Sequence, residues 1–316
     1  MNRMEEQRRN YMQQASLKDL LEAGCHFGHQ VNRWHPKAHT FIFQARDGIH
    51  IIDLAKTKAG LESAAAAIRD LGARNAVVLF VGTKRQAKAT VTEEASRVGA
   101  SYLSQKWIGG FFTNWEGVKK NIDKLNTLRN DRDTGGWDKF PKHEQVAFAK
   151  QIKRLELFYG GVSTLTKLPD AVFIIDIRKD DSAVREARIR EIPTVAIVDT
   201  NSDPSLVNYA IPANDDAVGS ITFITKFIAD AYLEGKNIAA KTAAAEKDKL
   251  AKDLERQTEA AKASKEVTQP KTEDKKPKAE AAKDKEDKPV KMAKKVKEDS
   301  PKKASPKDKK TVSRKG

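Results

Sequence analysis

The chain has 316 residues, a formal net charge of +15 and a mean hydropathy of −0.64. This length is enough for one large domain or two modest ones with a buried core. The single cysteine, Cys25, excludes an intramolecular disulfide and favours a reducing compartment. No apolar run approaches the roughly 18 residues of a membrane span, and residues 1–14 lack the apolar stretch of a signal peptide. These features predict a cytoplasmic protein without a membrane partner.

The positive charge is concentrated near the C-terminus. Residues 237–316 contain 25 Lys and Arg against 15 Asp and Glu, so they carry +10 of the net charge. This segment has no aromatic residue. Strong helix formers in about 239–262 predict that a helix continues there, and the Lys/Pro/Ser mixture beyond Pro270 predicts a disordered tail. Both an electrostatic arm for RNA and a solubilising extension fit this composition.

Residues 16–236 alternate predicted helices and strands. Short apolar runs indicate buried parallel strands, and polar caps followed by helical periodicity indicate the helices between them. This alternation predicts a doubly wound α/β domain of the flavodoxin or Rossmann type. In chain order we expect a helix at 54–71 behind Asp53, a strand at 76–81, a helix at 84–98, a strand at 171–176, a helix at 181–190, a strand at 194–198, and a last helix from Asp215 and Asp216 to about Glu234.

One stretch interrupts this alternation. Residues 114–160 carry two charged helical patterns, at about 115–129 and 143–159, and no strand between them. The polar segment 130–141 contains two adjacent glycines and predicts the turn. We therefore expect an inserted helical hairpin in which one apolar stripe faces another, namely Val118, Ile122 and Leu125 against Val146, Ile152 and Leu155.

The segment Phe80–Gln86 follows a predicted strand and leads into a predicted helix. Doubly wound proteins bind phosphate at this place, where backbone N–H groups and the helix dipole converge. The segment lacks both the Gly-x-Gly-x-x-Gly fingerprint and the Gly-x4-Gly-Lys-Ser/Thr loop. A nucleotide- or phosphate-binding enzyme remains the alternative here, while Lys84 and Arg85 suit an RNA phosphate.

Two clusters carry residue types that bind metals. One group of side chains near the N-terminus has the residue types of a zinc site. It offers only one thiolate, and its spacing is looser than Cys-x2-Cys, so contacts within a turn are the simpler interpretation. Carboxylates follow the predicted strands, where caps and turns again explain them better than ligands. We predict no required cofactor, with Mg²⁺ near Asp199 and Asp203 as the open alternative. The clusters are Cys25, His26, His29, His35 and His39, and Asp176, Asp199, Asp203, Asp215 and Asp216.

Basic and aromatic residues are interleaved at two places, Arg33–Lys37 and Lys106–Trp115. A cation beside a flat ring can hold a backbone phosphate while the ring stacks on a base or sugar. Trp and Phe are also common core residues, so the pattern alone does not decide between the two roles. No Gly-x-Ser-x-Gly elbow or other nucleophile–base pairing is visible, and we predict no catalytic residue and no enzyme activity.

Taken together, several blocks resemble the bacterial-type family of small-subunit ribosomal protein two. They occur in order over about residues 16–236, and the clearest are 197–204 and 211–217. The other blocks are 20–29, 34–37, 41–43, 48–54, 81–84, 107–110, 113–115 and 168–170.

The resemblance implies an α/β domain with a projecting coiled-coil hairpin that binds small-subunit rRNA. It also implies contacts with other small-subunit proteins and recruitment of the large mRNA-binding protein one. We expect a structural constituent of the ribosome that is not a homo-oligomer. Residues 1–15 and the tail 237–316 exceed the common form, and their contacts stay unassigned. By charge and motif position, we expect rRNA contacts from Arg33, Trp34, Lys37, Lys84, Arg85, Lys106, Trp107, Lys119 and Lys120.

Overall fold

The computed structural model describes the backbone of residues 15–266 and the side chains of residues 15–244. The chain divides into two compact units after Glu259, and the fold below is that of the first unit. The predicted tail beyond Pro270 and residues 1–14 of the predicted N-terminal extension lie outside the described residues. Within residues 15–266, no helix is long and apolar enough to cross a membrane.

A five-stranded parallel sheet organises this unit. Its strand order is β5-β4-β6-β7-β8, which corresponds to the order 2-1-3-4-5 of flavodoxin-like sheets. The predicted α/β fold with a parallel sheet is therefore confirmed, and the strand order is consistent with double winding. The strands are β4 (Val78–Val81), β5 (Ser101–Leu103), β6 (Ala171–Ile174), β7 (Thr194–Val198) and β8 (Tyr209–Pro212).

Helices cover both faces of this sheet, because successive strand residues point to opposite sides. Phe80 and Phe173 pack with one group of helices, whereas Leu79 and Val172 pack with the other. The first group is α3 (Leu54–Ala73), α4 (Lys88–Arg97) and α8 (Val218–Glu266), and the second includes α7 (Asp181–Ile189). Asp53 caps α3 as predicted, by accepting from the Ala55 N–H at 2.9 Å.

The structure corrects two predicted helix starts. α4 begins at Lys88 rather than Lys84, since the chain first makes a turn in which the Ala87 N–H donates to the Lys84 carbonyl at 2.9 Å. Lys84 and Arg85 therefore precede the helix instead of forming its first turn. The last helix, α8, starts at Val218 rather than at Asp215 or Asp216, and it continues through the segment for which the sequence predicts prolongation.

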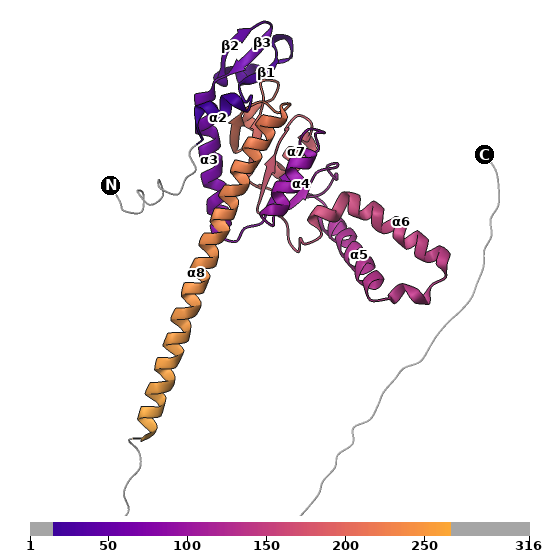
Figure 1. Cartoon of the computed structure of the whole chain (residues 1–316), viewed down its shortest axis with the longest axis vertical. Coiled ribbons are helices and arrows are strands. Elements are labelled where there is room, and N and C mark those ends of the chain that lie inside the picture. Colours follow the sequence, from indigo (N-terminus) through magenta and orange to yellow (C-terminus); the bar gives the residue numbers. More distant parts are fainter. Residues whose placement is uncertain (1–14, 267–316) are drawn as a thin grey trace, which may run out of the picture. The chain divides into compact units, whose positions relative to one another are not determined.

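The predicted helical hairpin consists of α5 (Trp115–Asp133) and α6 (Lys142–Tyr159), which lie side by side (Figure 1). Ile122 and Ile152 are buried as expected. Val146 is 54% exposed, however, and the aromatic side chains of Trp137 and Phe148 pack near the turn instead. The pairing of helices is observed, and coiled-coil geometry stays a prediction.

An N-terminal antiparallel sheet, which the sequence analysis did not predict, lies against the carboxyl ends of the parallel strands. The His29 N–H donates to the Thr200 hydroxyl at 2.8 Å, and the His35 N–H donates to the Thr200 carbonyl at 2.7 Å. A Cβ on Gly28 would lie 2.7 Å from Thr200 Cγ2, so this approach requires glycine. The segment comprises α2 (Leu17–Glu22), β1 (Phe27–Gln30), β2 (Ile42–Arg46) and β3 (Ile49–Ile52). The short 3-10 helices of the unit are Val31–Arg33, Pro36–Phe41, Gly136–Lys139, Gly160–Val162 and Pro204–Leu206.

Candidate functional site

The strand order points to the carboxyl ends of β4 and β6 as the candidate functional site. The connections from these neighbouring strands diverge, and α/β proteins bind ligands in the crevice that such a reversal of strand order opens. The chain places Lys84 just after β4 and Asp176 just after β6. The loop after β8 adds Asp215 and Asp216, so these residues gather at one charged edge of the sheet.

Lys84 is the centre of this charged edge. Its ammonium nitrogen contacts three carboxylates, at 2.6 Å from Asp216, 2.8 Å from Asp215 and 3.2 Å from Asp176. Burial opposes the charged form of Lys84, but these carboxylates raise its pKa above the usual range. Burial and repulsion from Asp176 and Asp199 raise the pKa of Asp215 to about 7. The ammonium group is an internal counter-charge, so this geometry does not support the predicted contact between Lys84 and RNA.

The loop after β4 is bound by other side chains of the protein. The Thr83 hydroxyl donates to Asp180 at 2.8 Å, and the Thr83 N–H donates to the same carboxylate at 3.4 Å. Lys179 donates to the Thr83 carbonyl at 3.2 Å. Backbone N–H groups at this position bind phosphate in nucleotide-binding sheets. Because Asp180 takes this N–H, the geometry lends no support to the nucleotide-binding alternative.

Part of the charged edge has the composition of a cation site. His29, Asp199 and Asp215 each offer one ligand atom, and these atoms lie within 4.8 Å of one another. A hydrogen bond with Asp199 raises the pKa of His29. Asp203 is outside this group, because it accepts from Lys37 at 2.6 Å. The structure therefore separates the two carboxylates that the sequence analysis paired, and Mg²⁺ near Asp199 and Asp203 stays a prediction.

In the part of the chain that the structure describes, the cysteine and histidines near the N-terminus do not form a common metal-binding group. Cys25 is buried, and burial raises the pKa of its thiol. His35 accepts from the Lys37 N–H at 3.3 Å, whereas a ring nitrogen of His39 lies 2.9 Å from the Pro36 carbonyl oxygen. Among the described residues, His29 is the member of this cluster that belongs to a possible metal-binding group.

A second charged centre, Glu186 on α7, was not identified from the sequence. Glu186 is 9% exposed, and its carboxylate accepts five hydrogen bonds at 2.8–3.2 Å from the loop before α5. Burial opposes ionisation of Glu186, but these donors hold its pKa below the usual range. The donors are the indole N–H of Trp107, the backbone N–H groups of Gly110, Phe112 and Thr113, and the Thr113 hydroxyl.

Arg190 completes this attachment four residues later in the chain. Its guanidinium donates to the carbonyls of Phe112 and Thr113 at 3.0 and 2.9 Å. In the segment that leads into α5, Glu186 thus binds N–H and hydroxyl donors, and Arg190 binds carbonyl acceptors. Trp107 is 6% exposed and its N–H is occupied, so it is a core residue here rather than the stacking platform that the sequence suggested.

Most of the other predicted RNA-contacting residues lie on the surface. Lys37 pairs with Asp203, and Trp34, which is 40% exposed, packs against His50 with ring centroids 5.5 Å apart. Within residues 15–244, the remaining cations of the set form no ion pair with a carboxylate. These exposed cations are Arg33, Arg85, Lys106, Lys119 and Lys120. Their contact with rRNA stays a prediction.

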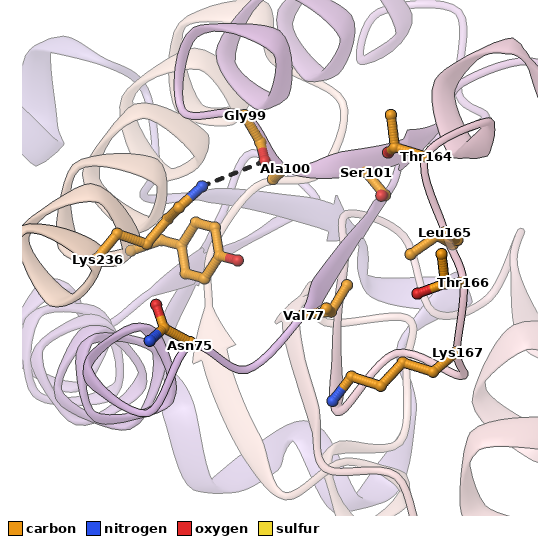
Figure 2. Close-up of a pocket in the computed structure, with 11 residues that line it drawn as sticks. Asn75, Val77, Gly99, Ala100, Ser101, Thr164, Leu165, Thr166, Lys167 and Lys236 are labelled. Atoms are coloured by element: carbon orange, nitrogen blue, oxygen red, sulfur yellow. Dashed lines mark hydrogen bonds between the residues drawn. The ribbon is translucent and has the colours of Figure 1, made fainter. Parts of the chain in front are cut away.

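The opposite edge of the parallel sheet contains a pocket of about 240 Å³ (Figure 2). Lys236 donates to the Val98 and Gly99 carbonyls at 3.1 and 3.4 Å, and the second of these bonds is drawn in Figure 2. Lys167, which also lines the pocket, pairs with Asp170 at 2.9 Å. Both cations therefore have partners within the protein, and they stabilise local structure rather than offering charge to a ligand.

Comparison with known proteins identifies relatives over nearly all of the α/β unit. The chain matches the family model described as ribosomal protein S2 over residues 20–235, which include every strand of the described structure. It is 45% identical over 245 residues to the small ribosomal subunit protein uS2 of Coprothermobacter proteolyticus, covering 76% of this chain and 91% of that protein. It is 47% identical over 230 residues to the protein of the same name from Desulfatibacillum aliphaticivorans, covering 73% and 78%.

Proposed function

This chain belongs to the ribosomal protein S2 family, and from that premise we propose that it is built into the small ribosomal subunit by contacts with rRNA and neighbouring proteins. The observation that carries the proposal is the match over residues 20–235, which covers both the charged edge and the helical hairpin. A structural constituent needs a rigid scaffold and an exposed charged surface, and it needs no catalytic group.

Exposed cations support the rRNA contact. Arg33, Arg85 and Lys106 are exposed and form no ion pair among the described residues, so their charge is available to phosphate oxygens. Lys119 and Lys120 add two exposed cations on α5. Contacts of this kind fix position on RNA through its backbone, and they recognise shape more than sequence. Lys84 is left out of this set because its charge is already neutralised.

Exposed apolar side chains support contacts with neighbouring proteins. Phe27, Phe43 and Ile49 are 48%, 68% and 37% exposed, and all three belong to the N-terminal antiparallel sheet. Exposed apolar side chains on one small sheet are typical of a protein interface. We place contacts with other small-subunit proteins, including the large mRNA-binding protein one, on this sheet rather than on the cationic surface.

Sedimentation tests the proposal directly. Tagged full-length protein from its own cells is separated on a sucrose gradient at moderate salt, and the fractions are blotted. We expect it to sediment with small subunits in near-stoichiometric amount and to dissociate as salt is raised, because counterions compete for phosphate. A peak confined to the light soluble fractions would contradict the proposal.

The enzyme alternative makes a different prediction. A nucleotide at 100 times its dissociation constant would stabilise the folded protein by about 2.7 kcal/mol. Since Asp180 and Lys179 occupy the Thr83 loop, we expect no change in melting temperature with ATP or GTP at millimolar concentration. A clear nucleotide-dependent increase would reopen that alternative.

A further inference from the structure

A groove of about 830 Å³ lies where α6 meets the loop that follows β5, and we call it the hairpin groove. It does not belong to the charged edge of the sheet. Its lining combines three cations with apolar and aromatic side chains: Lys106, Lys150 and Arg154, with Trp107, Leu155 and Phe158.

The charge of the hairpin groove is uncompensated. No carboxylate lines it, and within residues 15–244 its three cations form no ion pair. On the same hairpin Arg129 is paired with Glu156 at 3.0 Å. Lys119 and Lys120 also form no ion pair among the described residues, so what distinguishes the groove cations is that all three line one cleft together with apolar side chains. Cations without counter-charges in an apolar cleft concentrate positive potential and attract an anionic partner.

The spacing of these cations suits a linear anion with repeated charges. Lys150 and Arg154 are four residues apart on α6, so they lie on the same face with Cβ atoms about 5–6 Å apart. Lys106 comes from a different element, the loop after β5, and supplies a third charge. Successive charges along one strand therefore have partners on two sides of the groove.

The loop that carries Lys106 is held in place before any ligand arrives. Glu186 accepts hydrogen bonds from Trp107 and Gly110. The two residues between them in the chain, Ile108 and Gly109, line the groove. Gly109 has an open backbone, because a Cβ added there would meet no atom within 4 Å. A wall fixed in this way reduces the entropy that binding would cost.

We propose that the hairpin groove binds the sugar–phosphate backbone of one RNA strand, with Lys106, Lys150 and Arg154 holding phosphates. This inference rests on the proposed function, because it takes assembly with rRNA as given and assigns the site. The half-buried side chains of Leu155 and Phe158 beside the cations are suited to ribose and base surfaces. The partner is thus single-stranded or irregular RNA rather than a regular duplex.

An acidic peptide is the competing occupant, and the lining favours it less. A peptide brings backbone N–H groups that need acceptors when buried. The side-chain acceptors of the lining are limited to the amides of Asn121 and Gln151 and the hydroxyl of Tyr159, which already accepts from Asn121 at 3.1 Å. An RNA backbone needs mainly hydrogen-bond donors, and the cations of the hairpin groove are donors.

The first test measures rebinding of full-length protein to small subunits from which the native copy has been removed. Lys150→Gln with Arg154→Gln neutralises two groove cations, and Lys142→Gln with Lys153→Gln removes the same charge from other positions on α6. We expect the groove variant to bind about tenfold more weakly, with a salt slope of log K that is smaller by about 1.4. The control variant should match the wild type, and both variants should keep its circular dichroism spectrum.

The outcomes separate this inference from the proposed function. If the wild type does not rebind, the proposed function fails and the inference falls with it. If the wild type rebinds and both double variants behave alike, the hairpin groove is not an RNA site although the protein is ribosomal.

A cross-linking arm identifies the occupant. Cys25 is buried and is the only cysteine of the sequence, so Gln151→Cys provides a selectively reactive thiol in the hairpin groove. A photoactivated cross-linker on that thiol should give an RNase-sensitive product on the subunit, whereas Lys153→Cys should give much less. A protease-sensitive product that resists RNase, or equal RNA cross-linking from both positions, would overturn the proposal.

Discussion

The charged edge of the sheet and the hairpin groove contain the same kinds of cation, in opposite electrostatic situations. At the edge, three carboxylates lie within 3.2 Å of the Lys84 ammonium group. In the hairpin groove, Lys150 and Arg154 have no carboxylate partner among the described residues. A buried cation with compensating charge stabilises the fold, whereas an exposed cation without it is available for binding. Pairing therefore distinguishes the two roles better than basicity does.

The largest effect is expected at Lys84. Lys84→Met leaves Asp176, Asp215 and Asp216 near one another without their counter-charge, and removing one partner of a buried ion pair costs about 3–5 kcal/mol. We expect a loss of this size in the free energy of unfolding, measured by urea denaturation at pH 7. The salt slope of subunit binding should stay that of the wild type, because this ammonium group does not contact phosphate.

Arg85 provides the matched control for that experiment. It is the next residue in the chain, but it is exposed and forms no ion pair within residues 15–244. Arg85→Gln should change the free energy of unfolding by less than about 0.5 kcal/mol. Equal destabilisation by both substitutions would show that the charged edge is not the cause.

The next effect is expected at Glu186, which holds the loop that lines the hairpin groove. In Glu186→Gln, one carboxylate oxygen becomes an amide that cannot accept, so at least two of the five donors lose their partner. Buried unsatisfied donors cost about 1–3 kcal/mol each, and we expect a loss of about 3 kcal/mol. The melting temperature should fall by about 6–12 °C, measured by calorimetry.

Glu186→Gln also tests whether the loop contributes to RNA binding in the hairpin groove. Because the loop residues from Lys106 to Gly109 form part of the lining, release of this loop should weaken subunit binding even where the variant is fully folded. Arg185→Gln, one residue earlier and on the exposed side of α7, is the control and should leave both stability and binding near wild type. Unchanged binding by folded Glu186→Gln would mean that the loop is not part of the site.

The central part of the fold was predictable because burial leaves a clear signal in the sequence. Strands β4, β6 and β7 are internal to the sheet and buried on both faces, so they are continuous apolar runs. Strands β5 and β8 are its two edges, and the short Ser101–Leu103 and the proline-containing Tyr209–Pro212 lack that signal. The N-terminal sheet was missed for a related reason, since its strands are largely exposed and include glycine and histidine.

The site was less predictable because its contacts join residues that are distant in the chain. Lys84 has the composition and position of a phosphate ligand, and only the fold shows that Asp215, 131 residues away, accepts from it. Glu186 binds mostly backbone N–H groups, which no residue type marks. The sequence did contain a usable signal for Lys150 and Arg154, a basic pair at helical spacing, but not for the loop that faces them.

A smaller effect is expected for a single exposed cation of the predicted rRNA surface. Arg85→Gln should reduce the salt slope of subunit binding by about 1 while leaving stability unchanged, because it removes one phosphate contact and no internal one. The measurement is rebinding to depleted subunits between low and moderate salt. A slope equal to that of the wild type would place Arg85 outside the rRNA interface and would restrict the binding surface to the other cations.

The smallest effect concerns an intermediate case, the exposed pair Lys37–Asp203. Burial opposes ionisation of Asp203, but Lys37 and hydrogen bonds from Ser205 lower its pKa to about 2. A carboxylate with a depressed pKa stabilises the fold above its unfolded pKa, so this contribution should be complete above about pH 4 and be lost between about pH 4 and pH 2. In Lys37→Gln the pKa of Asp203 should rise towards its usual value, as measured by carboxyl NMR titration.

The accompanying change in stability at pH 7 should stay below about 1 kcal/mol, because Lys37 is 57% exposed and water screens the pair. A much larger loss would mean that Lys37 resembles Lys84 and belongs to the internal charge network. A pKa that does not move would mean that Ser205 alone holds the carboxylate, which would leave the Lys37 ammonium free for rRNA. The result for Lys37→Gln therefore shows whether an exposed cation with a partner inside the protein can still offer its charge to rRNA.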